Sequence, residues 1–371
     1  MEKILLEDCC EILDSMRVPI TSSDRVEGPY PYYGANGIQD YVADYIFDDE
    51  LVLLAEDGGN FGSNERPIAY RVSGKCWVNN HAHVLKPKEG LDVDYLCYSL
   101  MFYNVGGMVN GATRQKLTQA AMRQMLIPKR TMEEQRYIVD LLAKVVALKE
   151  KRQQELDELD NLIKARFVEM FGENGRVVPL TDYVWFQEGP GVRSVDFTDK
   201  GTILLTGSNI NDNEISFGYK SDRFISDELA SGKYAHFICD KGDILVVSSA
   251  IAPEKFDRKV TIVQEDKKYC LNTGIIRFKP NKEYMTLGYF REFLKTDYFK
   301  HQVMAEMRGI AQMHFGPSHL KQMTILLPES MEQQIEFEQF AKQVDKSKVA
   351  VQKALDRAQL LFDSLMQEYF G

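Results

Sequence analysis

One segment of this 371-residue chain occurs twice. Residues 132–172 and 331–371 align without a gap, so that Gln135 meets Gln334 and each copy ends in Phe-Gly. Self-similarity of this length constrains the fold more than any single motif, because it indicates two copies of one structural plan. The chain is therefore expected to be organised as globular segment, repeat, globular segment, repeat.

Both copies of the repeat are predicted to be long α-helices. Apolar residues recur at gaps of three and four, as in Ile138, Leu142 and Val145, and neither copy contains Gly or Pro before its final Gly. At about 1.5 Å per residue, each helix would be roughly 60 Å long, too long for one small domain to bury. One such helix would suggest a dimerisation coiled coil, whereas two in one chain indicate an internal antiparallel pair. The first apolar stripe is weakest at residues 149–154, which are polar.

The bulk composition narrows the class of protein. Hydrophobic residues make up 44% and charged residues 27%, as in soluble globular proteins. No apolar run approaches the eighteen or so residues of a membrane span, and the N-terminal segment is too acidic for a signal peptide, so a cytoplasmic location is expected. The six cysteines include no CxxC and no Cys/His spacing suited to zinc, which predicts reduced, mostly buried thiols.

The net charge of −10 argues against a simple nucleic-acid binder, which usually carries a basic patch. Residues 1–128 contain 11 Lys and Arg against 18 Asp and Glu, whereas residues 173–328 contain 20 of each. Any contact with DNA must therefore come from local clusters, or from a complex in which partner subunits supply positive charge.

The two globular segments repeat one order of predicted elements. Each has a strand that runs into a turn of Gly or small polar residues, at 48–62 and 241–250. Next come an alternating strand, a turn and another strand at 68–87, and one strand at 269–280, and both stretches end in Lys-Pro. A helix is expected next, at 92–103 and 285–299. A short helix and a strand closing on Ile/Leu-Pro follow, at 111–128 and 309–328.

This cyclic order, with the Gly-rich turn after a strand, the lead-in at 111–128 and a long helix ending in Phe-Gly, resembles the DNA-specificity subunit of type I restriction-modification systems over essentially the whole chain. The resemblance implies an α+β fold with an internal pseudo-twofold repeat, in which two mixed α/β target recognition domains are separated by two long antiparallel helices. The implied parts are recognition domain 1 (1–128), the central helix (129–172), recognition domain 2 (173–328) and the C-terminal helix (329–371).

The same resemblance implies a non-catalytic role. Each domain would read one half of a bipartite, asymmetric site in double-stranded DNA, and the helices would act as spacer and docking surface for two methyltransferase subunits. Restriction/translocase subunits would complete the enzyme, and S-adenosylmethionine, Mg²⁺ and ATP would belong to these partners. In agreement, the sequence contains no GxxxxGK[ST], GxSxG or HExxH motif, and no Asn/Asp-Pro-Pro-aromatic tetrapeptide of an amino-methyltransferase.

Base reading requires Arg or Lys toward guanine, Asn or Gln toward adenine, and small side chains toward thymine, all on loops that reach the groove. The candidate DNA-binding residues on such loops are Asn60, Arg66, His81, Arg114 and Lys116 in the first domain and Arg193, Ser248, Ser249, Arg258, Lys259 and Arg308 in the second. For any one of them, an ordinary solvated surface side chain is the more common explanation.

The His81-Ala82-His83 triplet invites a metal-site reading, because alternate strand residues share a face. Aligning the repeats on Asn80 and Asn272 places His83 opposite Ile275, a core-like position, and no nearby carboxylate or Cys is expected to complete a ligand set. We therefore expect no metal here. Trp77 and the tyrosines of residues 30–33 are expected to pack in the core or in loops rather than stack on bases.

Two alternatives stay open. The chain could serve a related system in which methyltransferase and nuclease are fused in one partner polypeptide. It could also be a scaffold that binds only proteins, assembled through its helices.

Overall fold

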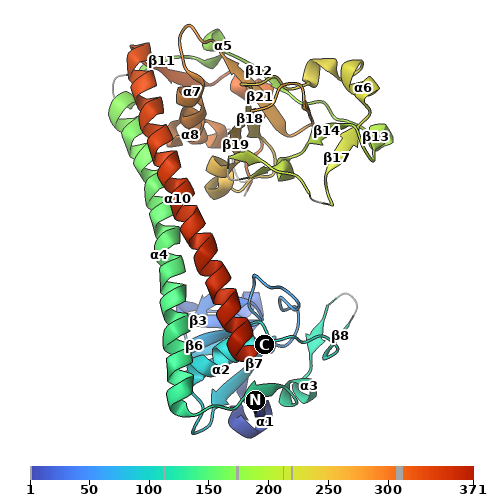
Figure 1. Cartoon of the computed structure of the whole chain (residues 1–371), viewed down its shortest axis with the longest axis vertical. Helices are drawn as coiled ribbons and strands as arrows, with labels where there is room; N and C mark the ends of the chain where they lie inside the picture. The colour runs from blue at the N-terminus through green and yellow to red at the C-terminus, as the bar shows by residue number, and fades with distance from the viewer. Residues whose placement is uncertain (1, 112–113, 173–174, 212, 219, 306–311) are drawn as a thin grey trace. The chain divides into compact units, whose positions relative to one another are not determined.

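The structure, a computed structural model, describes residues 2–111, 114–172, 175–211, 213–218, 220–305 and 312–371 (Figure 1). The chain folds as two compact units, unit 1 (Met1–Gln154 and Gln352–Gly371) and unit 2 (Glu155–Val351). Each unit takes half of both long helices, α4 (Met132–Phe171) and α10 (Met331–Phe370). This division differs from the domain boundaries expected from the sequence, which stay predictions.

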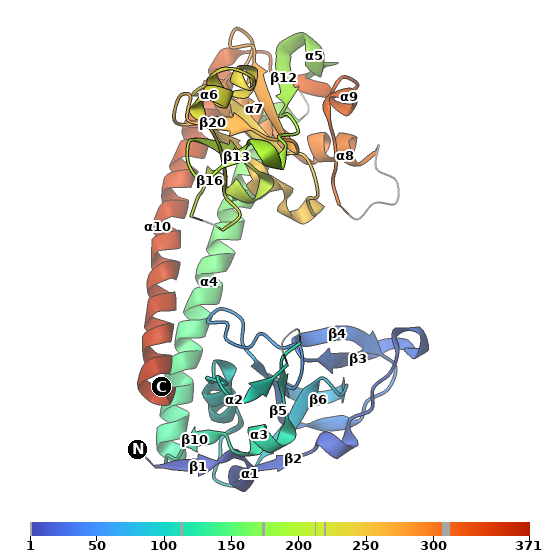
Figure 2. The same cartoon turned by 90° about the vertical axis from the view of Figure 1, so that its right-hand side faces the viewer.

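Unit 1 is built around one six-stranded sheet. Its strands lie in the order β2-β7-β5-β6-β3-β4, and Figure 2 shows β4 at the edge beside β3. The pairing of β3 with β6 is parallel, and the other pairings are antiparallel. The strands and helices of unit 1, besides the long helices, are β1 (Lys3–Leu5), α1 (Leu6–Cys9), β2 (Cys10–Ile12), β3 (Glu27–Gly34), β4 (Gly37–Val42), β5 (Phe47–Ala55), β6 (Ala69–Val78), β7 (Ala82–Pro87), α2 (Val93–Met101), β8 (Val109–Asn110), β9 (Lys116–Leu117), α3 (Gln119–Arg123) and β10 (Leu126–Pro128).

Unit 2 contains two four-stranded sheets, ordered β12-β21-β18-β19 and β13-β17-β14-β20. The strands and helices of unit 2, besides the long helices, are β11 (Arg176–Pro179), α5 (Leu180–Tyr183), β12 (Val184–Glu188), β13 (Phe197–Thr198), β14 (Thr202–Leu205), β15 (Ile210–Asn211), β16 (Glu214–Ile215), β17 (Arg223–Ile225), α6 (Asp227–Ser231), β18 (Ile244–Val247), β19 (Val260–Ile262), β20 (Tyr269–Leu271), β21 (Ile275–Pro280), α7 (Leu287–Leu294), α8 (Asp297–Ala305), α9 (Pro317–Leu320) and β22 (Thr324–Leu327).

The two units share a common frame. The neighbours β2-β7-β5-β6 of unit 1 recur as β12-β21-β18-β19 in unit 2, and the antiparallel pair β1-β10 recurs as β11-β22. In each pair, the first strand of the domain binds the strand that leads into a long helix. The repeat predicted from the sequence is thus present in the strand topology.

Two elements expected as continuous are divided. Residues 269–280 form β20 and β21, which belong to different sheets, because Asn272 and Gly274, with a φ of +80°, interrupt the extended chain. Residues 285–299 contain α7 and the start of α8, because Lys295 and Thr296 form a turn between them.

The long helices lie antiparallel in each unit, as expected from the resemblance. In unit 1, Lys149 of α4 lies over the ring of Phe362 of α10, while Arg130, just before α4, lies over Tyr369, near the end of α10. Unit 2 contains the ion pairs Asp160–Lys348 (2.6 Å) and Arg166–Glu336 (3.0 Å). The residue number rises along α4 from one pair to the next while it falls along α10, as antiparallel helices require. Residues of the predicted apolar stripes belong to the hydrophobic core of each unit. The core of unit 1 contains Ile138, Leu142, Val145 and Leu365 of these stripes together with Phe362, and the core of unit 2 contains Ile163, Phe337 and Val344 together with Phe167 and Phe171.

A buried glutamine ties the first turn of each long helix to its domain. In unit 1, Gln135 Oε1 accepts from the backbone N–H of Asp92, the N-cap of α2, and its amide donates to the carbonyls of Gly90 and Arg130. In unit 2, Gln334 Oε1 accepts from the N–H of Thr286, the N-cap of α7. Their match in the sequence repeat is therefore a shared structural role.

Within the described part of the chain, no helix combines the length and apolarity that crossing a membrane requires. The six cysteines are buried and free, as predicted.

Candidate nucleic-acid interface

Two loops of unit 1 meet where β5 ends. Residues 56–58, which follow β5, are fastened by backbone hydrogen bonds to residues 115–117, as Leu117 N–H donates to Glu56 O (2.7 Å) and Gly58 N–H to Gln115 O (3.1 Å). Gly58 has a φ of +64°, a conformation that glycine adopts at little cost. A Cβ on Gly58 would lie 3.2 Å from Arg114 Nε. We call residues 56–58 and 114–117 the loop pair of unit 1.

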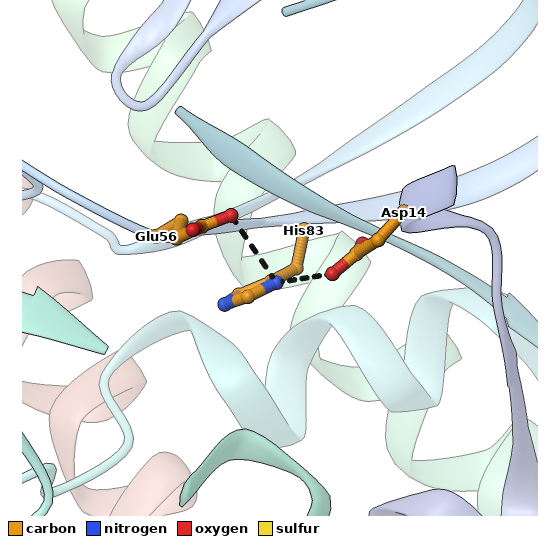
Figure 3. Close-up of side chains that lie close together, drawn as sticks. All are labelled: Asp14, Glu56 and His83. Carbon is orange, nitrogen blue, oxygen red and sulfur yellow. Dashed lines mark hydrogen bonds and ion pairs between the residues drawn. The ribbon is translucent and has the colours of Figure 1, made fainter. Parts of the chain in front are cut away.

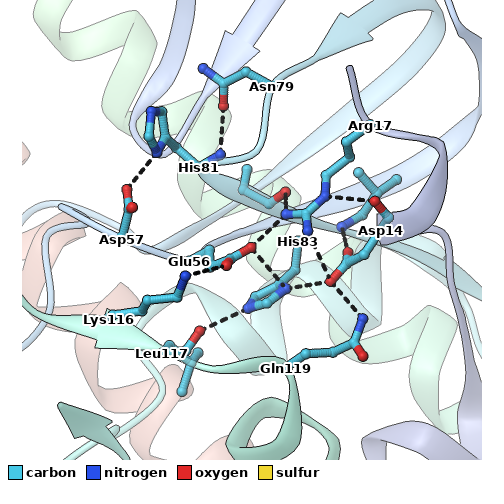
Figure 4. A network of polar contacts seen from close by, with 12 residues as sticks. Asp14, Arg17, Glu56, Asp57, Asn79, His81, His83, Lys116, Leu117 and Gln119 are labelled. Carbon is cyan, nitrogen blue, oxygen red and sulfur yellow. Dashed lines mark hydrogen bonds and ion pairs between the residues drawn. The ribbon is translucent and has the colours of Figure 1, made fainter. Parts of the chain in front are cut away.

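Three of the candidate DNA-binding residues come together at this loop pair. Arg114 Nη2 and His81 Nδ1 each lie 2.7 Å from Asp57 Oδ1, and Lys116 Nζ lies 2.9 Å from Glu56 Oε1. Figure 4 shows the His81–Asp57 and Lys116–Glu56 contacts side by side. The side chains of Arg114 and Lys116 are 61% and 49% exposed, so both remain accessible to a ligand.

A buried charge network underlies the loop pair. His83 is fully buried, with Nδ1 2.7 Å from Asp14 Oδ2 and Nε2 2.9 Å from the carbonyl of Leu117 (Figure 4). Both ring nitrogens thus face oxygen acceptors, and the imidazole links η1 (Asp14–Met16) to the loop that carries Lys116. Arg17 completes the network with a 2.6 Å ion pair to Glu56.

The carboxylates of the network stay charged. Burial alone would raise the pKa of Asp14, but hydrogen bonds from His83, the Val84 backbone and Gln119, together with the His83 charge, hold this pKa below its ordinary value. Burial would likewise raise the pKa of Glu56, which the hydrogen bonds from Arg17 and Lys116 keep lowered. Native contacts of these two groups therefore favour the ionised form.

The structure corrects the expectation that no carboxylate lies near the histidines. Asp14, Glu56 and His83 present ligand atoms that all lie within 4.8 Å of one another (Figure 3). His81 is not part of this group, because its Nδ1 contacts Asp57. A divalent ion would have to displace Arg17 and Lys116 from the carboxylates, so the group fits a salt-bridge network rather than a metal centre.

The backbone register also corrects the alignment of His83. Glu56 N–H donates to His81 O in unit 1, and Ser248 N–H donates to Gly274 O in unit 2. Counting from these bonds, His83 corresponds to Ile276, not Ile275. Ile276 is fully buried, so the position belongs to the core in both units.

Unit 2 has a matching loop pair at the end of β18, formed by residues 248–250 and 313–315. Phe315 N–H donates to Ser248 O (2.9 Å), as Leu117 does to Glu56, and Ala250 has a φ of +58°, close to that of Gly58. Ser249 Oγ lies 2.9 Å from His314 Nδ1. The same backbone arrangement thus carries carboxylates and cationic side chains in unit 1 and a serine and a histidine in unit 2.

The other candidates lie in different settings. Ser248 is fully buried, so its hydroxyl is not exposed to a ligand in this conformation. Lys259 Nζ donates to Ile210 O, Gly207 O and Asn211 Oδ1, which gives this ammonium a structural role that the sequence did not reveal. Asn60 is half-buried, with its amide nitrogen 3.5 Å from the carbonyl oxygen of Pro67. Exposed positions are held by Arg66, Arg193 and Arg258. Arg308 falls outside the described residues.

Sequence reasoning missed Asp14, Arg17, Glu56, Asp57 and His314, which hold the candidates in place. No local motif marks them, since their partners are tens of residues away in the chain. The candidate residues stay predictions as DNA contacts.

Comparison with known proteins identifies the family. The family model of the type I restriction modification DNA specificity domain matches residues 1–158 and again residues 174–357. A putative type I restriction enzyme specificity subunit of Haemophilus influenzae is 31% identical over 301 residues, which cover 78% of this chain and 75% of that protein. A type I restriction enzyme specificity subunit of Escherichia coli is 25% identical over 115 residues, 31% of this chain and 27% of that protein.

Solved structures share the fold. The type I restriction-modification S subunit from M. genitalium aligns with a TM-score of 0.51 at 13% identity, covering 100% of this chain and 96% of that one. A chain from a structure of complex assembly and conformational transition in the type I restriction-modification system aligns with a TM-score of 0.55 at 14% identity, covering 100% and 97%. Two matches of the family model, which together span most of the sequence, establish that this chain belongs to the type I restriction-modification DNA specificity family, whose members are non-catalytic recognition subunits.

Proposed function

We propose that each unit reads one half of a bipartite, asymmetric DNA site through its loop pair. The observation that carries this proposal is that the same backbone arrangement, a strand end clasped by a second loop, occurs in both units with different side chains. A common frame suits a common docking mode in the major groove, and different side chains suit different half-site sequences. Arg114, Lys116 and His81 would contact the first half-site, and Ser249 with His314 would contact the second.

The long helices would set the distance between half-sites and bind two methyltransferase subunits. Large apolar side chains stay exposed on both helices, where a solvated helix would carry polar ones. In unit 1 these include Tyr137 (63% exposed) and Leu360 (69%), and in unit 2 Val168 (60%) and Val349 (55%). Such residues support a protein-binding role. S-adenosylmethionine, Mg²⁺ and ATP would be bound by the methyltransferase and restriction/translocase partners.

An exchange of domains tests this function. The chain is produced with its methyltransferase partner, and the methylated motif is read by methylome sequencing of the host. Replacing residues 1–128 by the first domain of another family member should change one half-site and leave the other half-site intact. A change in both half-sites, or a motif that is not bipartite, would contradict the proposal.

Binding assays separate the alternatives. A DNA-binding complex should lose affinity steeply with salt, because each phosphate contact adds about 0.9 to the slope of log K against log salt. A protein-only scaffold would show no such dependence. Purification of the complex would show whether the methyltransferase and nuclease are separate or fused chains.

A further inference from the structure

Asp57 joins two candidate base-reading side chains that come from different segments. Its Oδ1 lies 2.7 Å from Arg114 Nη2 in one loop and 2.7 Å from His81 Nδ1, just before β7. Arg114 Nη2 and His81 Nδ1 are themselves 3.5 Å apart. The Asp57 side chain is 20% exposed, against 61% for Arg114, so the carboxylate forms the less accessible base of the cluster.

The contacts leave complementary groups available on the two side chains. With Nη2 held by Asp57, the guanidinium of Arg114 has further N–H donors for the O6 and N7 acceptors of guanine. In the tautomer whose Nδ1–H donates to Asp57, Nε2 of His81 is an acceptor, suited to the exocyclic amino group of adenine or cytosine. Asp57 thus fixes a donor and an acceptor together.

A carboxylate at a surface that meets DNA needs a specific use, because it repels phosphates. A mobile arginine is attracted to any phosphate and carries no sequence information, whereas a fixed guanidinium can match one base edge. Gly58 allows Arg114 to hold this position, because a Cβ on residue 58 would lie 3.2 Å from Arg114 Nε. The bare Gly58 backbone therefore leaves room for the guanidinium.

We propose that Asp57 is a positioning residue that makes Arg114 and His81 discriminate one base pair of the first half-site instead of binding phosphate. This inference rests on the proposed function of unit 1. In unit 2 the matching position is Ser249, whose contact is with His314, so the second half-site would be read without such a carboxylate.

The test uses the full chain in complex with its methyltransferase partner. Asp57→Ala and Asp57→Asn are compared with wild type by methylome sequencing, and by binding to cognate duplexes and to duplexes with each base pair of the first half-site substituted. Both variants should lose on the order of tenfold discrimination at one base pair of the first half-site, with the second half-site unchanged. Non-specific affinity should stay equal or rise, with a salt slope steeper by about one, because Arg114 is then free to contact a phosphate.

Two further variants serve as controls. Asp48→Asn removes an exposed carboxylate near the start of β5, roughly 30 Å of extended strand from Asp57 at about 3.3 Å per residue, and should leave discrimination unchanged. Arg114→Ala should lose preference at the same base pair as Asp57→Ala. In the double variant Asp57→Ala with Arg114→Ala, the loss of discrimination should be smaller than the sum of the two single losses, because both substitutions remove the Arg114 contact, while only Asp57→Ala also releases His81.

The inference would be overturned if Asp57→Ala left base-pair discrimination unchanged. A uniform loss of affinity for every duplex would also overturn it, because a merely structural role of Asp57 produces that result. Failure of the proposed function is a different result, a wild-type complex that methylates no bipartite motif.

Discussion

The buried network under the loop pair of unit 1 makes a quantitative prediction for His83→Leu. The substitution removes the hydrogen bonds that the buried His83 ring makes with the Asp14 carboxylate and with the carbonyl oxygen of Leu117. The Asp14 carboxylate, which is itself buried, then lacks its histidine partner. Removing a hydrogen-bond partner from a buried charged group costs about 1 to 3 kcal/mol or more. Asp14 retains the Val84 N–H, the Gln119 amide and a 3.5 Å ion pair with Arg17, so we expect a loss of about 2 to 3 kcal/mol at pH 7.

The two tryptophans allow this loss to be assigned to one unit. Trp77 lies in unit 1 and Trp185 in unit 2, and the sequence contains no others. In a Trp185→Phe background, urea unfolding followed by fluorescence reports on unit 1 alone. In a Trp77→Phe background, fluorescence reports on unit 2. There Ile276→Leu, at the position that matches His83, is the control, and this conservative core exchange should lower the free energy of unfolding by less than about 1.5 kcal/mol.

The loss should also depend on pH in a defined direction. The folded-state pKa values of Asp14 and Glu56 are lowered, so their contribution to stability is present above the unfolded carboxyl pKa of about 4 and is lost as pH falls through the folded values. The difference between wild type and His83→Leu should therefore be large at pH 7 and shrink below about pH 4. A difference under about 1 kcal/mol at pH 7, or one that grows with acidity, would refute the reasoning.

Three further predictions concern the joints and the helices. Gln135→Leu should destabilise unit 1, and Gln334→Leu unit 2, each by about 1 to 3 kcal/mol, because a buried backbone N–H loses its acceptor; equal effects of either variant on both tryptophan reporters would contradict this. Lys259→Met should destabilise unit 2 by more than 1 kcal/mol in urea unfolding, because three oxygens lose their donor, while Lys255→Met, at an exposed position, should have little effect. Inserting four residues into a long helix adds about 6 Å and should lengthen the gap in the methylated motif by about two base pairs with both half-sites retained; an unchanged gap in the methylome would rule out a spacer role for the helix.

The sequence by itself determined the plan of this protein. A gapless repeat with helical apolar spacing, in which Gln135 matches Gln334, predicts two long helices that each follow a globular segment. These signals are readable because they are periodic along the chain or repeated within it. The family could be identified for the same reason, since its evidence is the repeated order of short elements.

The tertiary structure alone decided which side chains form the candidate site. Asp14 meets His83 because β2 and β7 are neighbours in the sheet, and Asp57 meets Arg114 because backbone hydrogen bonds hold the residues after β5 against residues 115–117. In the sequence, Lys259 cannot be distinguished from an exposed cation, yet its ammonium donates hydrogen bonds to three oxygens of its own domain. Local patterns specify backbone elements, whereas the partner of a charged side chain is set by contacts across the sheet that no local pattern encodes.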